Sequence, residues 1–251
     1  MTDVGHSAPP GLLVTALVPD MGTAVAGAAI VAAAITTGAN VAAMVPVECG
    51  IPDACAPGSA GALLRWAAGH LDDPRLVTPL RFDADAGPLL AAQDAGILPH
   101  GATLDRARTA LVDGRSLLVV VDAVGPLEPI TPSLALLDLA ARWQLAVVAI
   151  VPVGATAIGQ ARALAALAAA RDVAFAGVVL VPAEQRRGAA HGDRHASWDD
   201  EQAATLRTTL AAMLDRPVAT LAPIDDVHDR AVLRESARAA GVEAFVARAH
   251  A

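Results

Sequence analysis

The chain has 251 residues, a net charge of −8 and 18 basic side chains, all of which are arginine. It contains no lysine, no tyrosine, and only three phenylalanines and three tryptophans. Without lysine, neither a Schiff-base enzyme nor a phosphate loop that holds a nucleotide through lysine can form. The acidic charge and the few aromatic side chains argue against a nucleic-acid partner.

The bulk composition predicts a single cytoplasmic domain. Hydrophobic residues make up 55% of the chain, which is enough for a sizeable core. The two cysteines, Cys49 and Cys55, are too few for a disulfide framework, so we expect a reducing compartment. Residues 21–47 carry no charge but contain glycine, asparagine and threonine, which favours a buried α/β segment over a membrane span. No basic residue precedes the first apolar run, so no secretory leader is predicted.

Short apolar segments alternate with helix-compatible ones along the chain. Strands are predicted at 11–17, 41–47, 116–122, 145–151, 173–181 and 217–221. Helices are predicted at 23–37, 60–70, 88–95, 103–112, 132–143, 157–171, 199–214 and 229–240. The remaining segments are expected to be a loop (51–58), an extended or irregular stretch (76–85) and a polar insert or flap (184–198).

This alternation predicts an α/β fold over residues 1–251, with a mainly parallel sheet covered by helices on both faces. In such a sheet ligands bind at the carboxyl ends of the strands. The turns after Leu17, Val47, Val121, Val151 and Val181 are therefore the expected site.

Three of these turns carry motifs that can be compared with a known family. They read V-T-A-L-V-P-D-M-G-T-A at 14–24, V-P-V-E-C-G at 45–50 and V-D-A-V-G-P at 121–126. In order and spacing they resemble the phosphate loop, the second strand end and the acidic strand end of dethiobiotin synthetase, a P-loop enzyme of biotin synthesis. The resemblance extends over nearly the whole chain. It implies a P-loop NTPase-like three-layer fold, and a homodimer, because the family forms its substrate site between subunits.

The departures from the family pattern lie where ATP and Mg²⁺ would bind. The phosphate-loop lysine is replaced by Thr23, the second active-site lysine by Val45, and the adenine-reading asparagine by Val181. Further replacements are Ala16 for the first loop glycine, Ala24 for the threonine that binds Mg²⁺, and Ser59-Ala60-Gly61 where an aspartate should join the Mg²⁺ site. ATP carries three to four negative charges that no matched position offsets, although Arg186, Arg187 or a partner subunit could supply a cation. ATP and Mg²⁺ are therefore disfavoured, and no cofactor is expected.

The residues that remain indicate an apolar crevice with three acids. A nucleotide-independent cyclase or isomerase would use Asp122, Glu48 and Asp20 as acids or bases on a neutral, apolar small molecule. Its binding residues would be Val18, Pro19, Met21, Thr23, Val45, Cys49 and Val181. The alternatives are a non-catalytic binding or scaffold relative, and an ATP-dependent synthetase with an altered loop. A crevice filled by side chains would favour the scaffold, and an open one an enzyme or ligand binder.

Each acid also has a structural interpretation. Asp122 is suited to cap the next turn, Asp20 to form an Asx turn, and Glu48 to be a solvated loop residue. His191 and His195 in the polar insert have chelating spacing on a helix, but no third ligand is identifiable and no metal site is predicted.

Overall fold

Six parallel strands form the central sheet. A computed structural model of the chain describes residues 9–18, 21–53, 58–69, 72–183 and 199–249. The sheet has the order β10-β9-β8-β1-β5-β2, and every pair in it is parallel. Its strands are β1 (Gly11–Thr15), β2 (Val41–Met44), β5 (Leu117–Val121), β8 (Leu145–Pro152), β9 (Phe175–Val181) and β10 (Val218–Thr220).

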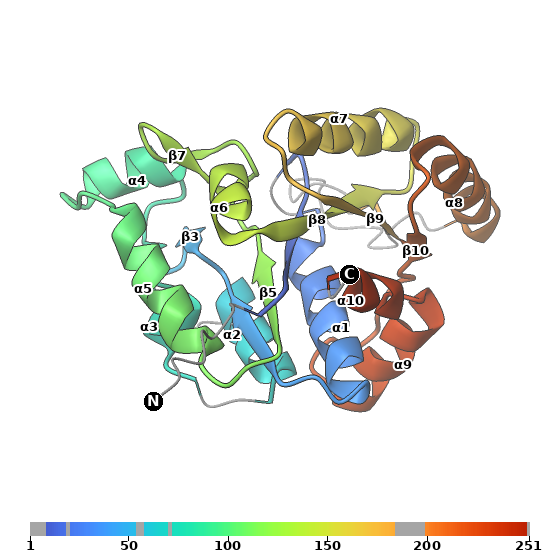
Figure 1. Ribbon diagram of the computed structural model, residues 1–251, viewed down its shortest axis with the longest axis horizontal. Coiled ribbons are helices and arrows are strands. Elements are labelled where there is room, and N and C mark those ends of the chain that lie inside the picture. Colours follow the sequence, from blue (N-terminus) through green and yellow to red (C-terminus); the bar gives the residue numbers. More distant parts are fainter. Residues whose placement is uncertain (1–8, 19–20, 54–57, 70–71, 184–198, 250–251) are drawn as a thin grey trace, which may run out of the picture.

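Helices cover both faces of this sheet (Figure 1). On β1, Leu12 and Val14 belong to one buried cluster, whereas Leu13 belongs to another on the opposite face. The first face carries α1 (Thr23–Thr36), α2 (Ala60–Ala67), α9 (Arg230–Ala240) and α10 (Glu243–Ala249). The second carries α5 (Gly101–Val112), α6 (Leu136–Trp143), α7 (Ala157–Ala169) and α8 (Asp200–Leu214). The predicted three-layer α/β fold is therefore confirmed.

Several predicted boundaries were wrong. The strand expected over 41–47 is interrupted, because Pro46 has no N–H to donate to a strand pair. A separate strand, β3 (Val47–Cys49), begins after it. This strand pairs with β4 (Leu80–Phe82), which lies inside the stretch that was expected to be irregular. The helix expected from residue 132 begins only at Leu136, after the hairpin of β6 (Pro129–Thr131) and β7 (Leu134–Ala135). Sequence analysis missed α3 (Pro74–Val77) and α10, while α4 (Pro88–Asp94) lies where a helix was expected.

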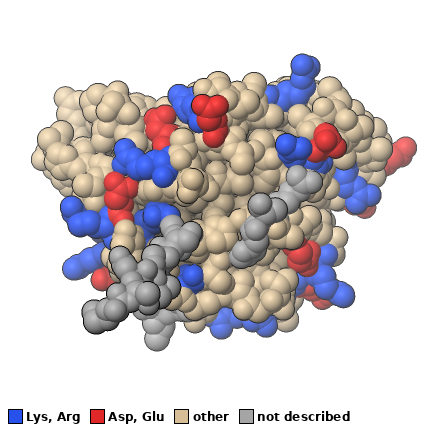
Figure 2. All heavy atoms as spheres, in the orientation of Figure 1, with Lys and Arg blue, Asp and Glu red and all other residues tan. Residues whose placement is uncertain are grey.

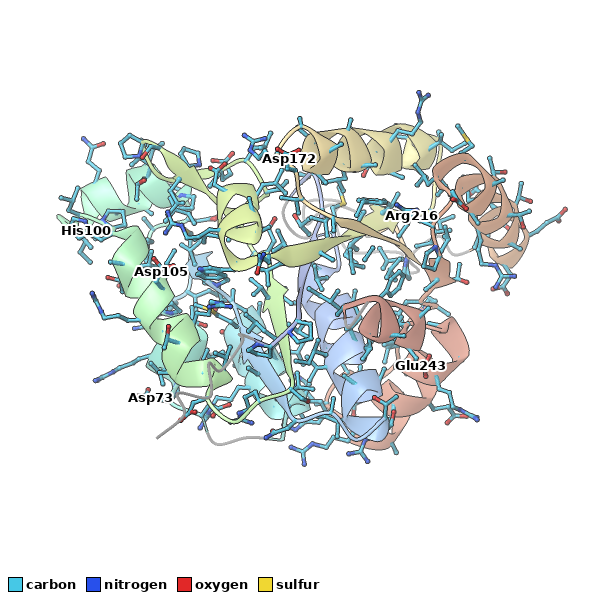
Figure 3. The ribbon with its side chains drawn as sticks, in the orientation of Figure 1. Asp73, His100, Asp105, Asp172, Arg216 and Glu243 are labelled. Carbon is cyan, nitrogen blue, oxygen red and sulfur yellow. The ribbon has the colours of Figure 1, made fainter. Side chains whose placement is uncertain are left out.

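Side-chain hydrogen bonds tie α5 to α6 on the second face. Asp105 on α5 (labelled in Figure 3) accepts hydrogen bonds from Trp143 Nε1 at 2.8 Å and from a guanidinium nitrogen of Arg142 at 3.0 Å. On the face of the molecule seen in Figure 2, acidic and basic side chains are interspersed. None of the helices within the described ranges is long and apolar enough to cross a membrane.

Helix α1 is the most deeply buried helix of the first face. Its buried residues include the unbroken run from Ala26 to Ala34. Gly27 allows a close approach to the sheet, since a Cβ added there would lie 2.3 Å from Val121 Cγ2 on β5. Small side chains therefore bring the backbone of α1 directly against the centre of the sheet.

Gly27→Ala is expected to destabilise the protein, because the clash with Val121 outweighs the better helix propensity of alanine. Gly159→Ala in α7 is the matched control, because no atom lies within 4 Å of an added Cβ there. We expect urea unfolding to show a loss of about 1–3 kcal/mol for Gly27→Ala and a gain of up to about 1 kcal/mol for Gly159→Ala. Equal effects of the two variants would contradict the close packing of α1.

Candidate functional site

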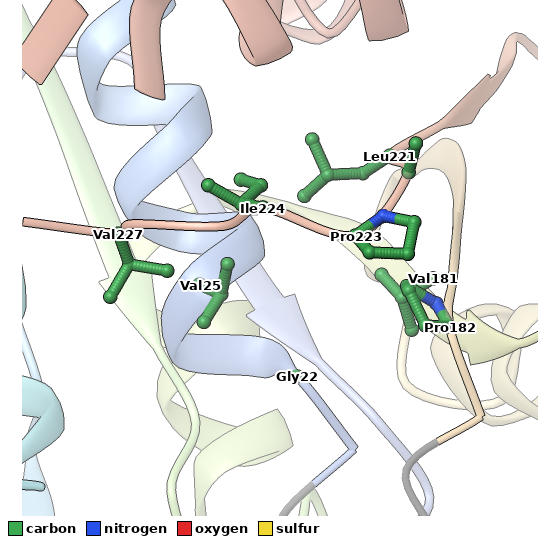
Figure 4. A pocket seen from close by; sticks show the side chains of 9 residues that line it. Gly22, Val25, Val181, Pro182, Leu221, Pro223, Ile224 and Val227 are labelled. Carbon is green, nitrogen blue, oxygen red and sulfur yellow. The ribbon is translucent and has the colours of Figure 1, made fainter. Parts of the chain in front are cut away.

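The candidate site lies where the strands of the parallel sheet end. The chain leaves β1 at Thr15 and enters α1 at Thr23, and the carboxyl end of β5 leads directly to Asp122. Strands β9 and β10 end beside the N-terminus of α1, because Val181 and Leu221 line one pocket together with Gly22 (Figure 4). This is the edge at which open α/β sheets bind ligands.

Asp122 is buried and holds the ends of two neighbouring strands together. Its side chain, 2% exposed, accepts a hydrogen bond from Thr15 Oγ1 at 2.5 Å through Oδ2. Its Oδ1 accepts from the backbone N–H groups of Val124 at 2.8 Å and Gly125 at 2.7 Å. The carboxylate thus caps the turn after β5, as its structural interpretation predicts. Thr15, which donates the hydrogen bond to Asp122, was not predicted as a site residue. Its place in the motif at 14–24 was the signal that could have indicated it.

Burial raises the pKa of Asp122 from 3.8 to about 6. The hydrogen bonds from Thr15, Val124 and Gly125 favour the charged form and oppose this rise, while the nearby Glu128 adds to it. The group is therefore poised to change its protonation state just below neutral pH.

Glu48 on β3 is buried too, so the interpretation as a solvated loop residue was wrong. Its side chain is 3% exposed and lies at the N-terminus of α2. Oε1 accepts from the Ala60 N–H at 2.6 Å, and Oε2 accepts from Ser59 Oγ at 2.9 Å. Longer contacts join Oε2 to the Gly61 N–H at 3.4 Å and to Thr78 Oγ1 at 3.5 Å. A carboxylate in this place is stabilised by the positive end of the helix.

The other expected site residues have very different environments. Val45 is completely buried, Thr23 and Val181 are buried, and Val18 is exposed. Met21 is partly buried against the core of the first face. The Cys49 thiol has a pKa raised to about 11 by burial and by the carboxylates of Asp85 and Glu48, which leaves it protonated and unreactive. Pro19, Asp20, His191 and His195 lie outside the described residues.

An apolar pocket of about 230 Å³ lies between the N-terminus of α1 and the segment after β10 (Figure 4). The nine described residues that line it are glycine or carry apolar side chains: Gly22, Val25, Val181, Pro182, Leu221, Ala222, Pro223, Ile224 and Val227. Of the expected site residues that the structure describes, only Val181 belongs to this lining. Neither Asp122 nor Glu48 does, because each is hydrogen-bonded elsewhere.

Sequence analysis missed five residues of this lining: Leu221, Ala222, Pro223, Ile224 and Val227. The turn after the last strand was not among those examined, although the run Leu221-Ala222-Pro223-Ile224 is apolar and follows a strand end. Within the described ranges, no group of three or more histidine, cysteine, aspartate and glutamate side chains is placed to hold a metal ion.

Comparisons with known proteins identify relatives of this chain. A family model, AAA_26, described as an AAA domain, matches residues 10–228. The ATP-dependent dethiobiotin synthetase BioD of Synechocystis sp. is 38% identical over 114 residues, which are 45% of this chain and 47% of that protein. The BioD of Gloeothece citriformis is 34% identical over 107 residues, 41% of this chain and 45% of that protein. The matched region thus spans about half the length of these curated relatives.

Among solved structures, the cell-division protein MinD of Aquifex aeolicus has 14% sequence identity and a TM-score of 0.49, over 95% of both chains. The family model extends from just before β1 to beyond β10 and so includes every strand of the central sheet. The chain therefore belongs to the AAA_26 family of AAA domains and is a dethiobiotin synthetase-like protein with a P-loop type of fold.

Proposed function

We propose that this protein binds the apolar part of a small molecule in the strand-end pocket and does not transfer phosphate from ATP. The observation that carries the proposal is the pocket itself, which is open and whose described lining residues are all glycine or apolar. Val181 stands where the resemblance places the adenine-reading asparagine, so the pocket occupies the corner that would otherwise take the base. A volume of about 230 Å³ suits a small apolar group.

The residues present do not fit ATP with Mg²⁺. At the first turn of α1, Thr23 and Ala24 replace the lysine and the Mg²⁺-binding threonine. None of the described residues that line the adjoining pocket is basic, and Arg186 and Arg187 lie outside the described residues. The side chains of the pocket offer no hydrogen bond to a purine edge. Asp122, the remaining acid of the motif, already accepts three hydrogen bonds from the chain. Nothing in this set offsets the charge of a triphosphate.

A nucleotide-independent cyclase or isomerase is the second candidate. The observation that favours it is the pKa of about 6 for Asp122, which suits proton transfer near neutral pH. Two observations place it behind the binding function. The oxygens of Asp122 and Glu48 are engaged by the chain itself, and neither residue lines the pocket. A scaffold protein was expected to have a crevice filled by side chains, so the open pocket also favours a ligand binder over a scaffold.

The expected cytoplasmic location remains a prediction.

The raised pKa of Asp122 predicts a pH-dependent stability. Because the folded protein binds this proton more tightly than the unfolded chain, the contribution of Asp122 is fully present below pH 3.8 and is lost as pH rises through about 6. In urea unfolding, the stability of the wild type minus that of Asp122→Asn should fall by about 1–3 kcal/mol between pH 4 and pH 7. A difference that stays constant or rises with pH would contradict a raised pKa.

Filling the pocket should abolish apolar binding. Val227→Trp places a large ring in the lining, whereas Met213→Trp changes an exposed residue of α8 and serves as the control. With toluene as the probe, saturation-transfer NMR should show binding to the wild type and to Met213→Trp, and at least tenfold weaker binding to Val227→Trp. Equal signals from all three proteins would contradict the assignment of the pocket.

We also propose the homodimer that the family resemblance implies. Three large apolar side chains are exposed on α4 and the loop after it: Leu90 is 63% exposed, Ile97 50% and Leu98 72%. Exposed apolar side chains gathered in one segment are typical of an interface.

If this segment forms the interface, a buried negative charge should separate the subunits. Leu98→Glu should reduce the mass measured by light scattering from two chains to one, whereas Met213→Glu, another exposed apolar position, should leave it unchanged. A wild type that is already monomeric at micromolar concentration would refute the dimer.

A further inference from the structure

One wall of the apolar pocket is a segment that is neither helix nor strand. This wall segment, residues 221–229, joins β10 to α9. It supplies five of the described lining residues: Leu221, Ala222, Pro223, Ile224 and Val227. Ile224 and Val227 lie beside Val25 of α1, which belongs to the facing wall (Figure 4). The position of the wall segment therefore sets the width of the pocket.

The two ends of the wall segment are held by different contacts. At its start, the Leu221 N–H donates to the Leu180 carbonyl of β9 at 2.8 Å. At its end, the exposed side chains of His228 and Arg230 contact Trp66 of α2. The rings of His228 and Trp66 meet edge to face, with 5.5 Å between their centroids. The Arg230 guanidinium lies over the indole ring, 5.2 Å from its centre, and Nη2 donates to the Trp66 carbonyl at 3.0 Å.

Trp66 can hold this end because α2 itself is fixed. The indole is half-buried and packs against the core of the first face, as do Ile224 and Val227 of the wall segment. The start of α2 is held by the carboxylate of Glu48, which accepts from the Ala60 N–H. An indole face attracts a guanidinium, and its flat surface keeps the contacting groups in place. Trp66 thus ties the wall segment to the same core that supports α1.

Arg230 is the first residue of α9, a position where a helix disfavours a cation. The N-terminus of a helix carries a partial positive charge, which repels the guanidinium. Capping is supplied by another residue, since Asp229 accepts from the N–H groups of Ala231 and Val232. The helix gains nothing from the charge of Arg230, which leaves the contact with Trp66 as the contribution of this side chain.

We infer that Trp66 is a positioning residue of the pocket: through His228 and Arg230 it holds the wall segment, and so determines the size of the group that the pocket accepts. The inference rests on the proposed apolar pocket and adds the residue that sets its width. A fixed wall gives a small ligand close contacts on both sides. A loosened wall contacts a small ligand poorly and yields to a larger one.

The test compares two variants that remove the same kind of contact. Arg230→Met keeps an unbranched side chain and removes the guanidinium from Trp66. Arg108→Met is the matched control, because the Arg108 guanidinium of α5 lies 5.6 Å from the centre of a Trp143 ring, in the helix layer on the other face of the sheet. Toluene and naphthalene are the probes, and NMR titration of the full chain gives their dissociation constants.

Arg230→Met should weaken toluene binding about two- to fivefold, the factor that corresponds to one exposed cation–π contact. Naphthalene binding should change by less than about twofold, because the loosened wall yields to the larger ring system. The melting temperature should move by no more than about 3 °C, since relief of the repulsion at the helix end offsets the lost contact. Arg108→Met should leave both affinities unchanged.

Trp66→Leu removes the contacts of both His228 and Arg230 with the indole ring. It should weaken toluene binding further, about five- to tenfold, and again change naphthalene binding less. Thermal unfolding checks that this variant is folded. A merely structural role of Trp66 would lower the melting temperature and leave the ratio of the two affinities unchanged.

Amide hydrogen exchange without a ligand separates this inference from the proposed function. The His228 and Asp229 amides donate to Asp226 within the wall segment and should exchange about two- to fivefold faster in Arg230→Met, whereas the Leu221 amide should not change. Faster exchange together with a wild type that binds neither probe would refute the proposed binding function and still support the anchoring by Trp66. An affinity ratio that is the same in Arg230→Met as in a wild type that binds both probes would overturn the inference.

Discussion

The close approach of α1 to the centre of the sheet is the constraint on which the rest of the structure depends. It requires Gly27 opposite Val121, since any larger residue would push the helix away from β5. The alanines that follow Gly27 continue this contact along α1, and the helix is therefore buried on several sides. Packing of α2, α9 and α10 around α1 then completes one face of the molecule (Figure 1).

This packing fixes the N-terminus of α1 at the ends of the strands. Asp122 joins β5 to β1 through Thr15, and Glu48 orders the start of α2. Acids at positions that could serve chemistry are thus used to hold the strand-end loops.

The fold was largely predictable from the sequence because buried parallel strands such as β5 and β8 are continuous apolar runs between helical segments. Strands β3 and β4 were missed because each has a charged residue, Glu48 or Arg81, at its centre and so shows no continuous apolar run. The position of Glu48 was not predictable, because its partners at Ser59 and Ala60 are set by the path of the chain between β3 and α2. The residues that follow β10 line the pocket because β10 lies beside β9 in the sheet, and sequence patterns do not predict the order of strands.

The central claim is that an apolar pocket has replaced the nucleotide site of a dethiobiotin synthetase-like protein. The most direct measurement is a calorimetric titration of the full chain with ATP, with and without Mg²⁺, at a protein concentration sufficient to detect millimolar dissociation constants. The account predicts no saturable heat that depends on Mg²⁺, because the chain has no lysine and Ala24 stands where the resemblance places the Mg²⁺-binding threonine. Saturable binding of one ATP per chain that is lost when Mg²⁺ is removed would contradict it.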